Sequence, residues 1–232
     1  MESKKNKTDI NLVVCDMAGT TIEEDNLVYK TLQRAIHKAG YDFSLEQVLA
    51  QGAGKEKKQA IESIISAYAG PTPQERIEAI FDDFLASLDD TYRTAVIRPQ
   101  PYAEEFFARL RQRGIRVVLN TGYNRSTAEA LLTKLGWTIG NTIDALVTAD
   151  DVANNRPHPD MILHAMHLFG IPSGATVAKI GDSTIDIQEG KNAGCSLNIG
   201  VTTGAHTWEQ LATAQPELIA NSLREVLPIL TN

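Results

Sequence analysis

Strands and helices alternate along the second half of this chain, and this pattern narrows the possible folds more than any other feature. Short apolar runs typical of strands are each followed by an amphipathic stretch, and all but the last of these stretches end near a glycine. The expected strands are 115–120, 145–148, 176–180 and a final one at 196–201, and the expected helices are 104–113, 126–135, 159–168, 185–193 and 206–214. Such alternation predicts an α/β fold with a doubly wound parallel sheet.

An earlier strand is separated from this region by a helical segment. A β-branched run at 9–15 predicts a buried strand that ends at Asp16, and helical spacing then continues from about Leu27 to Leu88. Four helices are expected here. The first covers 27–39, and the second begins at Ser44 with a Ser44/Gln47 capping box. The third covers 56–68, and the fourth begins after Thr72 with Pro73 in its first turn. We therefore expect a Rossmann-like core, residues 1–20 and 98–232, with an all-helical cap, residues 21–97, inserted after the first strand.

Composition excludes several classes of protein. Among 232 residues the net charge is −7, which argues against a nucleic-acid-binding surface. No apolar run approaches the ~20 residues of a membrane span, and no signal-peptide core follows the basic start. Two cysteines are too few for a disulfide framework. We expect a soluble cytoplasmic protein that binds neither nucleic acid nor membrane.

Polar side chains follow the expected strands at the points where each strand ends. Asp16, the Thr121-Gly122 pair, Arg156 and Asp182 stand at these positions, and ligands bind at this edge of a parallel sheet. Neighbouring carboxylates suit a hard cation such as Mg²⁺, which bridges to phosphoryl oxygens. Asp16 is then a candidate nucleophile that forms an aspartyl-phosphate, because a small-residue turn follows it.

Four segments carry a resemblance to a known family. They are Asp16-Met-Ala-Gly-Thr-Thr21, Thr121-Gly-Tyr123, Arg156-Pro-His-Pro159 and Gly181-Asp-Ser-Thr-Ile-Asp186. Together they resemble the four motifs of the haloacid dehalogenase superfamily, and more narrowly its phosphonatase-like branch. The resemblance covers nearly the whole chain, with the helical insertion at the position of that superfamily's cap.

The resemblance implies a role for each matching residue. Asp16 would be the nucleophile, and Mg²⁺ would be bound by Asp16, the backbone carbonyl of Ala18 and Asp182, with Asp186 in close support. The implied phosphate-binding and supporting residues are Thr121, Gly122, Arg156, Tyr123 and Ser183. The partner would be a small organophosphonate or phosphate substrate.

Ala18 occupies the position at which most members of the superfamily carry an aspartate that protonates the leaving group. Loss of a general acid typically costs ~10²–10⁴ in rate, so we expect poor hydrolysis of phosphate esters. The phosphonatase-like branch instead uses a cap lysine, three residues after a glycine, to form an imine with a 2-oxo-alkylphosphonate. Lys55 follows Gly52 at this spacing, and Lys57 and Lys58 are left open as alternatives.

Other positions depart from the phosphonatase pattern. Gln51, Lys58 and Asn26 stand where that branch has methionine, histidine and cysteine, which favours a different 2-oxo-phosphonate as substrate. The alternatives are a phosphate-monoester phosphatase similar to phosphoglycolate phosphatase, or a sugar-phosphate mutase. A non-enzymatic phospho-acceptor is more remote, because receivers lack the helical insertion. The apolar faces of 27–39 and 77–88 are either cap core or a homodimer contact.

Overall fold

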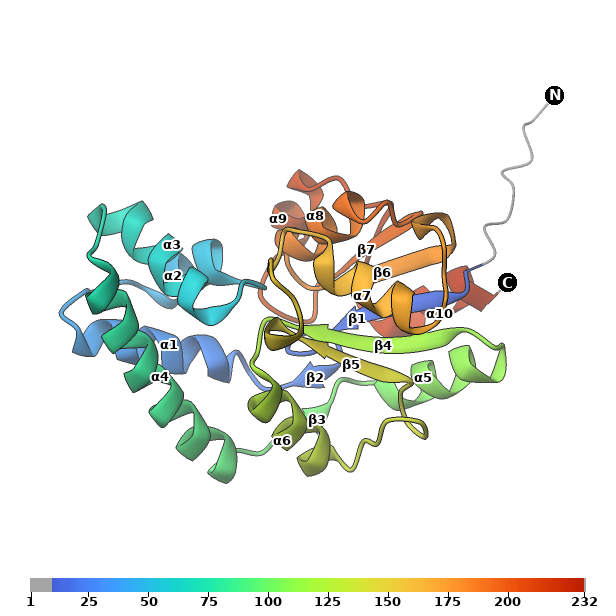
Figure 1. Ribbon diagram of the computed structural model, residues 1–232, viewed down its shortest axis with the longest axis horizontal. Coiled ribbons are helices and arrows are strands. Elements are labelled where there is room, and N and C mark those ends of the chain that lie inside the picture. Colours follow the sequence, from blue (N-terminus) through green and yellow to red (C-terminus); the bar gives the residue numbers. More distant parts are fainter. Residues whose placement is uncertain (1–9, 232) are drawn as a thin grey trace.

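Six parallel strands form the central sheet of the computed structural model, which describes residues 10–231 (Figure 1). The strands are β1 (Leu12–Asp16), β4 (Arg116–Thr121), β5 (Ala145–Thr148), β6 (Val177–Gly181), β7 (Leu197–Val201) and β8 (Leu218–Ala220). Their order across the sheet is β5-β4-β1-β6-β7-β8. The chain thus winds outward from β1 in one direction and then in the other, which confirms the predicted doubly wound fold.

The strand β1 is buried on both faces of the sheet. Val13 and Cys15 belong to the hydrophobic cluster that contains Phe106 of α5, whereas Leu12 and Val14 face the opposite cluster. Side chains alternate between the faces of a strand, so only a continuous apolar run can fill both sides. The helices of the core are α5 (Ala103–Gln112), α6 (Arg125–Leu135), α7 (Asp160–Leu168), α8 (Thr184–Asn192), α9 (Trp208–Thr213) and α10 (Leu223–Thr231).

Four helices form an insertion beside the sheet, between two short strands. These strands, β2 (Ile22–Glu23) and β3 (Arg98–Pro99), pair antiparallel and bring the two ends of the insertion together. The helices are α1 (Leu27–Lys38), α2 (Leu45–Gly52), α3 (Lys57–Ala69) and α4 (Gln74–Thr94). Figure 1 shows them as a separate lobe. We call this segment the helical insertion; the proposed domain boundaries at 20/21 and 97/98 stay a prediction.

Local signals locate most helix starts correctly. Ser44 caps α2 through the predicted capping box with Gln47. The start of α4 was predicted slightly wrongly, because Pro73 is the N-cap residue and the helix begins at Gln74. The ring fixes φ of Pro73 but leaves ψ free, and ψ here is extended at 142°.

The prediction that the strand at 196–201 is the last one is wrong. The strand β8 follows it, and its three residues are too short to display a period of two. The helix α10 comes next and contains Pro228, a residue that normally argues against a helix interior.

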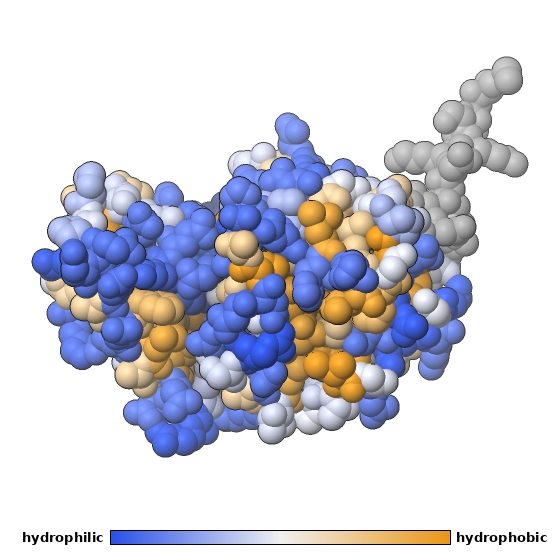
Figure 2. All heavy atoms as spheres, in the orientation of Figure 1, coloured by the Kyte–Doolittle hydropathy of each residue, from blue (hydrophilic) through white to orange (hydrophobic). Residues whose placement is uncertain are grey.

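On the face shown in Figure 2, the surface of the helical insertion is mainly hydrophilic. Hydrophobic residues gather instead over the core. Leu163 and Leu168 of α7 are among the large apolar side chains left exposed. Across residues 10–231, no helix combines the length and the apolar character needed to cross a membrane. The predicted homodimer through the insertion stays a prediction.

Candidate active site

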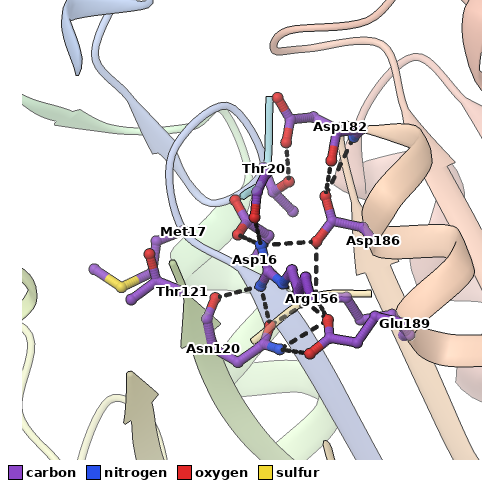
Figure 3. Close-up of polar contacts among 12 residues, drawn as sticks. Asp16, Met17, Thr20, Asn120, Thr121, Arg156, Asp182, Asp186 and Glu189 are labelled. Carbon is purple, nitrogen blue, oxygen red and sulfur yellow. Dashed lines mark hydrogen bonds and ion pairs between the residues drawn. The ribbon is translucent and has the colours of Figure 1, made fainter. Parts of the chain in front are cut away.

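Three neighbouring strands bring the predicted site residues to one edge of the sheet. Asp16 ends β1, Thr121 ends the adjacent β4, and Asp182 follows β6 on the other side of β1. Arg156 belongs to the loop between β5 and α7, and Figure 3 shows its side chain beside those of Asp16 and Asp186. All four side chains are almost completely buried. The structure therefore brings the predicted polar residues together into one cluster, which we call the aspartate cluster.

Arg156 holds the nucleophile candidate in place. Its Nη1 donates to Asp16 Oδ1 at 2.6 Å and to the carbonyl oxygen of Gly54, in the helical insertion, at 3.2 Å. Its Nε donates to Glu189 Oε2 at 2.9 Å, and its Nη2 donates to two oxygens of Asn120 at 2.8 and 3.0 Å. These contacts give all five N–H donors a protein acceptor. The predicted donation from Arg156 to a phosphoryl oxygen would require one of these bonds to be exchanged.

Three residues of the cluster were missed by the sequence analysis: Asn120, Lys179 and Glu189. Lys179 Nζ lies 2.6 Å from Asn120 Oδ1 and 3.2 Å from Glu189 Oε2, and Asn120 Nδ2 donates to Glu189 at 2.9 Å. A signal for Lys179 was available, because it is the one charged residue in the otherwise apolar strand β6. A buried lysine needs a carboxylate partner, which predicts an acidic neighbour.

Asp186 supports the cluster through both of its carboxylate oxygens. Its Oδ1 forms ion pairs with Lys179 at 3.0 Å and with Arg156 at 3.1 Å, and its Oδ2 accepts from Ser183. Burial alone would raise the pKa of Asp186, but the two cations lower it. With Ser183 it also forms the capping box of α8. Ser183 and Asp186 thus fix the start of this helix beside Asp182.

Charge in the aspartate cluster is not balanced. Its ionisable side chains are those of Asp16, Asp182, Asp186, Glu189, Arg156 and Lys179. Four carboxylates and two cations leave two negative charges uncompensated. Burial raises the pKa of Asp16 to about 6. Burial, together with repulsion from Asp16 and Asp186, raises the pKa of Asp182 well above its ordinary value.

The donor set fits a hard divalent cation. Two unpaired negative charges match its charge, and the donors are all oxygens. No group of three or more His, Cys, Asp or Glu side chains in the described part of the chain is arranged to hold a metal ion. A cation here would therefore depend on Asp16 and Asp182, completed by the Ala18 carbonyl and water.

The remaining predicted phosphate-binding residues, Thr121 and Gly122, directly follow Asn120, which is opposite Asp16 in the pairing of β1 with β4. Thr121 Oγ1 accepts from the backbone N–H of Tyr123 at 3.2 Å, which fixes the turn after β4. A Cβ added at Gly122 would lie 2.6 Å from the carbonyl oxygen of Lys55. This contact requires a glycine, since real Cβ atoms do not approach so closely. The loop before α3 therefore lies directly against the predicted phosphate-binding turn.

A second glycine brings the same loop against α8. Gly54 has φ of +73°, and a Cβ there would lie 2.4 Å from Ser183 Oγ. Its N–H donates to Tyr29 Oη at 2.8 Å. The helical insertion therefore closes over the aspartate cluster.

Glu24, in the turn between β2 and α1, lies in a buried chain of hydroxyl groups. Tyr92 Oη donates to Glu24 Oε2, and Tyr92 Oη lies 2.8 Å from Tyr123 Oη. This series of hydrogen-bonded side chains links the start of the insertion (Glu24), the end of α4 (Tyr92) and the core (Tyr123). Burial raises the pKa of Glu24 to about 7, opposed by its bonds to Tyr92 and Val28 and by the charge of Lys57.

Glu24 should make stability fall as pH rises. Its pKa increases from 4.5 to about 7 on folding, so its favourable contribution is complete below pH 4.5 and is lost as pH rises through 7. We expect the wild-type chain to lose about 3 kcal/mol relative to Glu24→Gln across this range. Urea unfolding at pH 5 and 8.5 measures this, with the exposed Glu23→Gln as control. Parallel pH dependence in all three proteins would contradict the prediction.

The doubly wound sheet, the helical insertion and the buried aspartate at the end of β1 together define the class: an α/β protein with a helical insertion and an acidic site at the carboxyl edge of its sheet. The family model described as haloacid dehalogenase-like hydrolase matches residues 10–194. The chain belongs to this family.

Two relatives agree with this assignment, and one solved structure shows the same fold. The chain is 33% identical over 211 residues to a phosphonoacetaldehyde hydrolase of Latilactobacillus sakei, covering 84% of this chain and 76% of that protein. It is 30% identical over 222 residues to a protein of Dickeya dadantii named "Probable phosphatase IndB", covering 93% and 91%. The crystal structure of a hydrolase from Pseudomonas syringae superposes with a TM-score of 0.83 at 18% identity, covering 94% of this chain and 96% of that one.

Proposed function

We propose that this hydrolase cleaves the carbon–phosphorus bond of a small 2-oxo-alkylphosphonate. The observation that carries the proposal is a combination: Asp16 is buried at the sheet edge, Lys57 of the helical insertion is buried, and position 18 is alanine. A carbon leaving group needs an electron sink rather than a proton donor, and an iminium ion is such a sink. The relative named phosphonoacetaldehyde hydrolase supports the same chemistry.

The bond changes are as follows. A neutral lysine amine adds to the substrate carbonyl, and loss of water with uptake of one proton gives an iminium ion. Asp16 Oδ attacks phosphorus, and the electron pair of the carbon–phosphorus bond moves into the carbon fragment to form a neutral enamine. Protonation at carbon and addition of water release the carbonyl product and the amine. A second water hydrolyses the aspartyl-phosphate and releases inorganic phosphate.

The other residues of the site would bind and orient the phosphoryl group. Thr121 Oγ1 and the Gly122 N–H are donors beside Asp16, and Arg156 orients the Asp16 carboxylate. Mg²⁺, bound by Asp16, Asp182 and the Ala18 carbonyl, would supply the positive charge that offsets the phosphoryl oxygens. The resemblance to phosphonatases implies that Lys55 is the imine-forming lysine.

A phosphate-monoester phosphatase is the second candidate, supported by the relative in Dickeya dadantii. The two functions differ in their need for a general acid at position 18. We expect phosphonoacetaldehyde or 2-oxopropylphosphonate to be hydrolysed faster than alkyl phosphate esters such as glycerol phosphate, whose alkoxide leaving group must be protonated. We also expect Ala18→Asp to raise hydrolysis of the phosphate esters by ~10²-fold. Phosphate release measures both. Fast hydrolysis of the esters by the wild-type enzyme, with no gain in Ala18→Asp, would favour the phosphatase.

A further inference from the structure

Three lysines of the helical insertion lie close together in sequence, and the structure gives each a different environment. Lys58 Nζ pairs with Glu78 Oε1 at 2.9 Å on the surface. Lys55 is partly exposed, and its amino group has no hydrogen bond or ion pair within residues 10–231. Lys57 is 6% exposed. We propose that Lys57, rather than Lys55, is the amine that condenses with the substrate carbonyl; this assignment rests on the proposed carbon–phosphorus chemistry and refines it.

Lys57 Nζ lies at the boundary between the helical insertion and the core. It donates to the carbonyl oxygen of Lys55 at 2.8 Å, the same oxygen that rests against Gly122. It is 5.2 Å from the ring centroid of Tyr29 and 5.1 Å from that of Tyr123. The amine is therefore next to the predicted phosphate-binding turn, with an aromatic wall contributed by each lobe.

The surroundings of Lys57 favour a neutral amine. It is the first residue of α3, and the positive end of a helix dipole disfavours a cation. Burial lowers its pKa, an effect that Arg156 reinforces and that Asp16, Glu56 and Glu24 oppose. Only the unprotonated amine is nucleophilic, so the direction of this shift suits addition to a carbonyl.

A cleft gives substrate a route to this amine. A cavity of about 280 Å³ lies between the insertion and the core, and Lys57, Gly122 and Tyr123 are among its lining residues. Asn155 also lines it, and the Oδ1 atom of Asn155 has no hydrogen-bond partner in the described part of the chain. Phe81 of α4 contributes an apolar wall. On this assignment the organic part of the substrate occupies this cleft, and its phosphoryl group extends past Gly122 towards Asp16, which does not itself line the cleft.

The sequence pattern is equally compatible with either lysine. Lys55 stands three residues after Gly52, and Lys57 stands three residues after Gly54. Burial separates the two candidates where spacing does not. On this assignment the new carbon–nitrogen bond forms at Lys57 Nζ, and the carbonyl oxygen leaves as water after one proton is taken up.

Trapping of the imine tests the assignment directly on the wild-type enzyme. Phosphonoacetaldehyde and 2-oxopropylphosphonate are each added with sodium borohydride, and the modified lysine is located by peptide mass spectrometry. We expect the reduced adduct on Lys57. We also expect Lys57→Arg, which keeps the charge but forms no imine, to lower phosphonate turnover by ~10³-fold or more. Lys38→Arg, at an exposed lysine of the helical insertion that pairs with Asp83, is the matched control and should keep wild-type turnover.

The other outcomes separate this inference from the proposed function. An adduct on Lys55, with phosphonate turnover retained in Lys57→Arg, would overturn the role of Lys57 and leave carbon–phosphorus hydrolysis intact. If neither phosphonate were hydrolysed nor trapped while phosphate esters were hydrolysed, both would fail. Because the adduct is mapped on the wild-type chain, the result does not depend on how Lys57→Arg folds.

Discussion

Asp16→Asn is expected to lower turnover by at least ~10⁴-fold, since removal of an enzyme's nucleophile typically has effects of this size. The amide is nearly isosteric and can still accept a hydrogen bond from Arg156, which lies 2.6 Å from Asp16 Oδ1. It cannot attack phosphorus to form an acyl phosphate. Phosphate release from both phosphonates and phosphate esters measures the loss, and mass spectrometry of acid-quenched enzyme detects phosphorylated Asp16 in the wild-type chain.

The same substitution should not destabilise the protein at alkaline pH. Burial raises the pKa of Asp16 to about 6, so the stability contributed by its protonated form is lost as pH rises through 6. Asparagine does not titrate, and we expect its unfolding midpoint at pH 8 to equal or exceed that of the wild type. Asp89→Asn, at an exposed position on α4, is the control for a generic loss of charge. Turnover by Asp16→Asn within tenfold of the wild type would rule out Asp16 as the nucleophile.

The fold was predictable because its signals are local and repeated. The alternation of apolar runs with amphipathic stretches predicted β1, β4, β5, β6 and β7 but not the two-residue strands β2 and β3, and parallel pairing then placed Asp16, Thr121 and Asp182 at one sheet edge. The strand β8 was not predicted, because three residues are too few to show the two-residue alternation of apolar and polar side chains that indicates a strand. Motif spacing thus predicted which residues meet, and the structure agrees on their proximity.

The partners of these residues were harder to predict, because they depend on contacts distant in sequence. Nothing near Arg156 in the chain indicates that its guanidinium contacts Glu189, on α8, and Gly54, in the helical insertion. The lysines show the same limit at short range. Lys55 and Lys57 are two residues apart, yet the start of α3 buries Lys57 and leaves Lys55 partly exposed. Which of two lysines so close in sequence is buried depends on how the two lobes pack against each other.

Arg156→Met should be the most destabilising of the substitutions considered, by about 3–5 kcal/mol, because it leaves buried carboxylates without their partner. Arg156 is 1% exposed and contacts Asp16, Asp186 and Glu189. Methionine has similar length but no donor, so these groups would lose both hydrogen bonds and compensating charge. Urea unfolding at pH 7.5 measures the change.

Arg125→Met is the matched control for this prediction. Arg125 also contacts two carboxylates, Asp151 and Glu129, but its side chain is 36% exposed. Exposed ion pairs contribute roughly 0–1 kcal/mol, so its loss should be small. Equal destabilisation by the two substitutions would contradict the assigned importance of the buried network.

A double substitution separates loss of charge balance from loss of packing. If the cost of Arg156→Met comes from uncompensated negative charge, then Glu189→Gln in the same chain should recover part of the lost stability, because it removes one of the four carboxylates. If the cost comes from packing alone, Glu189→Gln should add its own destabilisation to that of Arg156→Met. Recovery would also support the view that the aspartate cluster carries excess negative charge, the property on which its proposed affinity for Mg²⁺ depends.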